Sequence, residues 1–167
     1  MSREEYWVIQ DGLRVGFGQR DVSENSGKKI VTEGAVEQII LDINDATGLA
    51  ASVVTSDDAV VEGAHIPANS LILSAKLIVK SGGAFTSGGA PTLDVGTYDL
   101  DGAAVDEDGL IAAEVLANLD ADGDVVDGAG AQVGTVVTQD VRVAARANVA
   151  TYTAGAAQVV VEYIPQV

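Results

Sequence analysis

The chain has 167 residues and a mass of 17.0 kDa, which fits one domain of ordinary size. It contains no cysteine, which excludes a disulfide framework, a thiolate nucleophile and a Cys-ligated zinc site. Its formal net charge of −16 argues against DNA, RNA and anionic lipid as partners, because proteins bind phosphates through Lys and Arg. No run of about 18 apolar residues is present, so the sequence predicts no membrane span and no signal peptide.

The charges are unevenly distributed along the chain. Residues 1–30 hold five bases and five acids, whereas residues 31–167 hold four bases and twenty acids. Three of the seven aromatic residues also lie within the first 17 positions, and Trp, Tyr and Arg are enriched where interfaces bind most strongly. We therefore predict that residues 1–30 form an arm and residues 31–167 form the domain. The arm would dock on another subunit through Tyr6, Trp7, Arg14, Phe17 and Arg20.

A second interpretation of the N-terminal segment stays open. It would be the first strand of the domain, with its aromatic residues in the domain's own core.

Apolar and polar residues alternate in several short segments, which is the pattern of strands with one buried face. In chain order, strands are expected at residues 35–43, 50–55, 70–80, 92–99, 132–138, 141–147 and 158–164. Residues 148–153 and 156–164 are expected to form a C-terminal hairpin, because Thr153-Ala154-Gly155 supplies a turn between them.

One segment departs from this alternation. Residues 108–119 place Ile111, Val115, Leu116 and Leu119 at helical spacing, with Asp108 as a cap, so we predict a short helix there. The whole pattern predicts an all-β fold: an antiparallel β-sandwich, jelly-roll-like, with one short helix and an extended N-terminal arm.

The residues give little support to catalysis. His65 is the only histidine, and its position in a loop before a strand favours a structural role. Adjacent carboxylates such as Asp106-Glu107-Asp108 are expected by chance among 25 acids, so they are weak evidence for acid–base chemistry. We therefore expect a protein that is not an enzyme.

The best candidate metal site is an acidic loop. Oxygen ligands at alternate positions can converge on Ca²⁺, and this pattern occurs at Asp120, Asp122, Asp124 and Asp127. Val125 stands where an EF-hand has its turn glycine, and Ala131 where it has its bidentate Glu. An ordinary solvated loop is the alternative, and no other cofactor is expected.

Several segments, in their order along the chain, resemble structural proteins of tailed-bacteriophage virions. They are YW (6–7), DGLRVGFG (11–18), IPANSLILSAKL (66–77), AFTSGG (84–89), LDVG (93–96), DEDGL (106–110) and TAGAAQVVVEYIP (153–165). The resemblance implies a capsid decoration (cement) protein or a head-fibre base, forming a homotrimer outside the major capsid shell. Its implied partners are the major capsid protein and further copies of itself.

This interpretation implies synthesis in the host cytoplasm and a final location on the capsid exterior. Two alternatives remain. One is a tail-fibre or tail-tip module that binds the host surface, and the other is a glycan-binding β-sandwich, with or without a dependence on Ca²⁺.

Overall fold

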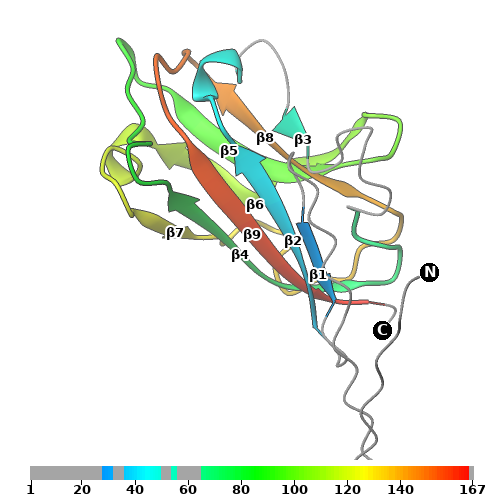
Figure 1. Cartoon of the computed structure of the whole chain (residues 1–167). Coiled ribbons are helices and arrows are strands. Elements are labelled where there is room, and N and C mark those ends of the chain that lie inside the picture. The colour runs from blue at the N-terminus through cyan, green and yellow to red at the C-terminus, as the bar shows by residue number, and fades with distance from the viewer. Residues whose placement is uncertain (1–27, 32–35, 50–53, 56–64, 166–167) are drawn as a thin grey trace, which may run out of the picture.

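The computed structural model describes residues 28–31, 36–49, 54–55 and 65–165 (Figure 1). In these ranges the regular structure consists of strands and two single 3₁₀ turns. The strands are β1 (Lys28–Val31), β2 (Glu37–Ile43), β3 (Val54–Thr55), β4 (Leu71–Val79), β5 (Thr92–Tyr98), β6 (Ala104–Val115), β7 (Val125–Asp127), β8 (Arg142–Asn148) and β9 (Ala157–Ile164). The turns are η1 (Ala46–Gly48) and η2 (Leu116–Asn118).

The strands form two antiparallel sheets, ordered β1-β2-β9-β4-β7 and β3-β8-β5-β6. Figure 1 shows β2, β9 and β4 side by side in one layer, with β5, β6 and β8 in the other. From β2 to β9 the chain changes sheet at each connection except β5 to β6. The predicted antiparallel β-sandwich is therefore confirmed.

The core lies between the two sheets and consists mainly of aliphatic side chains. Along β9 the residues alternate, so that Val159, Val161 and Tyr163 are fully buried while their neighbours face outward. They meet residues of the other sheet such as Val95 and Val143, which are equally buried. Burial of each branched side chain contributes about 1.5–3 kcal/mol to the free energy of folding, so the alternating buried residues supply much of the hydrophobic stabilisation of the sandwich.

Five predicted strands are present within one or two residues of the expected bounds: β2, β4, β5, β8 and β9. The predicted strand at 50–55 is seen as β3, and residues 50–53 lie outside the described part. β1 pairs with β2, so the end of the segment predicted as an arm belongs to the sheet.

The predicted helix at 108–119 is wrong, because these residues form most of β6 followed by η2. β6 is heavily bulged: the pairs Val95↔Ile111 and Thr97↔Asp106 set two steps of β5 against five of β6. The bulge buries Gly109, Leu110 and Ile111 in succession, which breaks the two-residue pattern of a regular strand.

Two further expectations about pairing are wrong. Residues 132–138 make turns and one isolated bridge, Leu71↔Val136, instead of a strand. The predicted C-terminal hairpin does not form, because β8 and β9 belong to different sheets and residues 149–156 cross between them. Residue alternation predicts a strand but does not say which partner it takes.

Candidate interaction surface

The outward side of the five-stranded sheet is a broad surface made by side chains that alternate with the buried ones. One row across it joins Ile40, Val160 and Lys76 with Asp127, and the next row joins Asp42, Gln158 and Ile78 with Val125. We call this surface the β9 face and define it by its outward residues: Gln38, Ile40, Asp42, Ser74, Lys76, Ile78, Lys80, Val125, Asp127, Gln158, Val160 and Glu162.

Ion pairs and hydrogen bonds join most of the polar groups on the β9 face. Lys80 Nζ lies 2.9 Å from Asp42 Oδ1, and Lys76 pairs with Asp127. Glu162 accepts hydrogen bonds from Gln38 Nε2 at 2.8 Å and from Ser74 Oγ at 3.0 Å. Exposed pairs of this kind add little stability, about 0–1 kcal/mol each, so their main effect is on the charge of the surface.

The β9 face is close to neutral, unlike the rest of the body. It carries two Lys against three carboxylates, whereas the other described side chains include two Arg against thirteen carboxylates. Its apolar members are partly exposed, and Val125 is 56% exposed. A nearly neutral surface with accessible apolar side chains is suited to contact with another protein.

On the outward side of the four-stranded sheet, β5 is covered by the bulge of its neighbour β6. A Cβ atom on Gly96 would lie 2.0 Å from the carbonyl oxygen of Asp106, so the β6 bulge rests directly on β5. Asp94 and Tyr98, which share this side with Gly96, are only 3% and 6% exposed. The β5 part of this side is therefore closed.

A charged network lies beneath that bulge. Arg146 Nη1 lies 2.5 Å from Glu107 Oε2, and Arg146 Nε lies 3.5 Å from Asp94 Oδ2. Burial raises the pKa of Tyr98, and the negative charge of Glu107 raises it further. The charged groups of this network pair with one another, so the network is explained by its role in holding the β6 bulge on β5 and β8.

Asp106 is the described carboxyl that most resembles a general acid. Burial raises its pKa, and so does the neighbouring carboxylate of Asp108. Its Oδ2 would lie 2.6 Å from a Cβ on Gly109, so the carboxyl packs against backbone. The shift follows from packing and from a like charge, which do not by themselves make a catalytic site.

The acidic loop predicted to bind Ca²⁺ uses its carboxylates for other contacts. Asp122 Oδ2 accepts a hydrogen bond from the Gly82 amide at 2.6 Å, and Asp124 Oδ2 accepts one from the Ala121 amide at 2.9 Å. Asp127 pairs with Lys76, and Asp120 is exposed. In the described ranges no three His, Cys, Asp or Glu residues are arranged to hold a metal ion. Calcium binding at these residues stays a prediction that the geometry does not favour.

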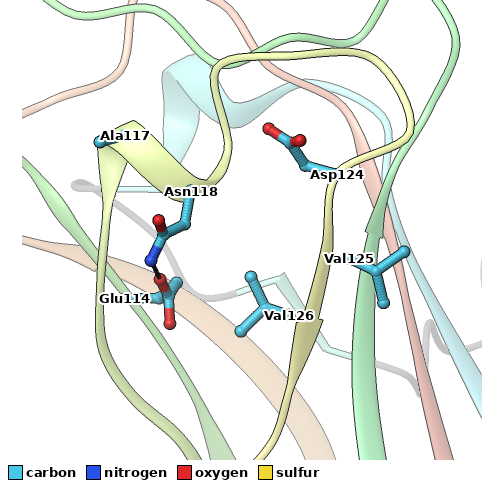
Figure 2. Close-up of a pocket in the computed structure, with 6 residues that line it drawn as sticks. All are labelled: Glu114, Ala117, Asn118, Asp124, Val125 and Val126. Carbon is cyan, nitrogen blue, oxygen red and sulfur yellow. Dashed lines mark hydrogen bonds between the residues drawn. The ribbon is translucent and has the colours of Figure 1, made fainter.

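A shallow pocket lies beside this loop, where η2 approaches β7. Figure 2 shows its six lining residues, Glu114, Ala117, Asn118, Asp124, Val125 and Val126, with Asn118 Nδ2 donating to Glu114 Oε1 at 2.5 Å. Its volume of about 280 Å³ is at the low end for ligand sites, and its lining lacks the aromatic side chains common in them. The pocket therefore does not indicate a small-molecule site.

The residues predicted to dock on the capsid are Tyr6, Trp7, Arg14, Phe17 and Arg20, and all five lie outside the described residues. His65 is partly buried. The amide of the next residue, Ile66, donates a hydrogen bond to the carbonyl of Val141, the residue before β8. No described helix is long and apolar enough to span a membrane.

Sequence reasoning did not predict the β9 face. The signal was available in part, because Lys76, Ile78 and Lys80 occupy the alternate positions of the strongest predicted strand. The sequence did not indicate the order of the strands in the sheet. This order matters because the pairing of β9 with both β2 and β4 brings Val160 beside Ile40 and Lys76.

Comparison with solved structures finds similar chains in two phage particles. A chain in the capsid of Ralstonia phage GP4 is similar with a TM-score of 0.55 and 20% identity, covering 83% of this chain and 90% of that chain. A chain in the cyanophage Pam1 capsid asymmetric unit has a TM-score of 0.45 and 15% identity, covering 95% and 97%. No protein family and no curated protein sequence matches the chain. The GP4 likeness shows a shared fold.

Proposed function

We propose that this chain is a structural protein of a bacteriophage particle, a decoration (cement) protein that binds the outer surface of the major capsid lattice. The observation that carries the proposal is the sandwich fold shared with a chain of the GP4 capsid. The virion resemblance of the sequence and the weak case for a catalytic site support it.

The distribution of charge suggests how the protein works on the particle. The neutral, aromatic segment of residues 1–30 grips the capsid, and the acidic body faces solvent. A protein that bridges neighbouring capsid subunits stabilises the shell through added interface, and a specific contact of this kind buries about 1,200–2,000 Å². The excess of carboxylates keeps neighbouring bodies, and nucleic acid released at lysis, from adhering.

The proposal is tested with capsids that lack the protein and with purified chain. The full chain should co-sediment with the particles and raise their disruption temperature. A chain lacking residues 1–20 should keep the melting curve of a folded protein but lose particle binding. Failure of the full chain to bind capsids would reject the decoration role, and full binding by the truncated chain would reject the docking arm.

Location within the virion separates the decoration role from a tail role. Electron microscopy of particles carrying a labelled chain should show label distributed over the head. Label confined to the tail or its fibres would instead support the host-binding alternative.

A further inference from the structure

We propose that the β9 face is where copies of this chain meet, turned toward the axis of a trimer so that like faces contact one another. The inference assigns an interface to the homotrimer that the virion resemblance implies, and it rests on that homotrimer and not on capsid binding. It can be tested with purified chain, so its failure would leave capsid binding untouched.

The first argument is the contrast between the two outer surfaces of the sandwich. On the four-stranded sheet the bulge of β6 covers β5, with its backbone within 2.0 Å of a Cβ position on Gly96. The β9 face keeps Ile40, Ile78 and Val160 partly exposed on three neighbouring strands. The second surface thus offers accessible apolar side chains on three neighbouring strands.

The second argument is electrostatic. Surfaces that meet around a symmetry axis meet their own kind, so a strongly acidic surface would repel its copies. The two Lys and three carboxylates of the β9 face nearly cancel, whereas the other described side chains are dominated by carboxylates. Lys80–Asp42 and Lys76–Asp127 also place both signs on the face, which allows exchange of partners between copies.

The third argument concerns the arrangement of side chains within the face. Ile40 and Val160 lie side by side at its centre, and Asp127 and Val125 lie on the edge strand β7. Ile40 and Val160 thus form an apolar pair bordered by the Lys76–Asp127 and Lys80–Asp42 ion pairs, and an apolar patch beside polar groups is typical of a protein interface. A copy placed there would cover Ile40 and Val160 first.

Oligomeric state tests this directly, using the mass in solution by light scattering. The wild-type chain should give three times its 17.0 kDa mass. Val160→Glu adds a negative charge at the centre of the face and should give monomers. Val105→Glu adds the same charge at a residue 43% exposed on β6, and it should stay trimeric. Monomeric wild type, or a Val160→Glu chain that stays trimeric, would overturn the proposal.

A second variant guards against a misfolded Val160→Glu chain. The Lys76 side chain is 50% exposed, so Lys76→Glu should fold and still weaken the trimer. Its melting curve, recorded beside the mass, shows whether dissociation comes without unfolding. A folded Lys76→Glu chain that associates as tightly as wild type counts against the proposal.

The absence of cysteine allows a direct proximity test. Lys76→Cys should join copies covalently when treated with a short bifunctional maleimide. The matched Val105→Cys variant should remain a single chain. Equal cross-linking of the two variants, or cross-linking of Val105→Cys alone, would place the contact elsewhere.

Discussion

The Asp94 carboxylate accepts a hydrogen bond from the Ala113 amide, with Oδ1 and N 2.7 Å apart. Ala113 has a positive φ of 49°, so this bond holds the backbone of β6 at a bulge. The other oxygen of Asp94 accepts from Asn148 Nδ2 and faces Arg146. One buried side chain thus ties β5 to the bulged edge strand and to the end of β8.

We predict that Asp94→Ala lowers the free energy of unfolding by about 2–3 kcal/mol, because the Ala113 amide and Asn148 Nδ2 lose their acceptor and Arg146 loses one of its two carboxylates. The loss is below that of a fully buried ion pair, since the Arg146 side chain is 29% exposed. Urea denaturation measures it. The exposed Asp120→Ala change is the control and should alter stability by less than about 0.5 kcal/mol. Equal effects of the two variants would contradict the bracing role of Asp94.

The close contact between β5 and the β6 bulge gives a second prediction. Gly96→Ala places a Cβ 2.0 Å from a backbone oxygen of Asp106, which cannot rotate away. We expect a loss of about 1–3 kcal/mol or more in unfolding free energy. Gly88→Ala is the matched control, because nothing lies within 4 Å of its Cβ position. A Gly96→Ala protein as stable as wild type would mean that the bulge does not rest on β5.

Much of the fold follows from the sequence because a regular strand with one buried face carries a two-residue pattern. β9 shows it throughout and β4 shows it from Ala75 to Val79, and both strands were predicted within a residue or two. β6 lost the pattern at its bulges, where Leu110 and Ile111 are buried in succession. The four-residue spacing of Ile111 and Val115 imitates a helix, but Ile111 is 2% exposed and Val115 is 48% exposed, because the bulge at Ala113 turns them to opposite faces of the strand.

The candidate surface was less predictable than the fold. Outward positions such as Lys76 and Ile78 can be read from one strand, but a surface needs the neighbours of that strand. β9 is the last strand in the chain, and it lies between β2 and β4, far from both in sequence. Such long-range order depends on packing of the whole sandwich, which local alternation does not encode.

Removal of two buried tyrosine hydroxyls should change the stability of the protein in different ways. Tyr163 donates a hydrogen bond to Glu37 Oε2 at 2.6 Å, whereas the buried Tyr152 hydroxyl has no hydrogen-bond partner within the described structure. We expect Tyr163→Phe to lower unfolding free energy by about 1–2 kcal/mol, and Tyr152→Phe to be neutral or stabilising. Thermal and urea denaturation measure both, and each variant is the other's control. A larger loss for Tyr152→Phe would mean that this hydroxyl is satisfied in solution.

The raised pKa of Tyr152 leads us to predict a loss of stability at alkaline pH. Burial, together with the negative charges of Asp94 and Glu114, raises the pKa of Tyr152 from 10.0 to about 12. The folded state therefore keeps a proton that the unfolded state gives up, and stability falls as pH rises between about 10 and about 12. Urea denaturation at about pH 8 and about pH 11 should show the fall, which Tyr152→Phe should reduce. An unchanged slope in that variant would assign the effect to the other buried tyrosines.

The bond between Asp122 and Gly82 separates a structural role of the acidic loop from a calcium role. Asp122 Oδ2 lies 2.6 Å from the Gly82 amide, so the carboxylate joins this loop to the turn after β4. We expect Asp122→Ala to lower the free energy of unfolding by about 0.5–1.5 kcal/mol, because the group lost is a hydrogen-bond acceptor. The melting temperature should therefore fall by the same amount in EDTA and in excess Ca²⁺. Asp120→Ala, at an exposed position of the same loop, is the control and should show little change in either condition. A bound cation would give a different result: Ca²⁺ would raise the wild-type melting temperature, and Asp122→Ala would abolish that rise.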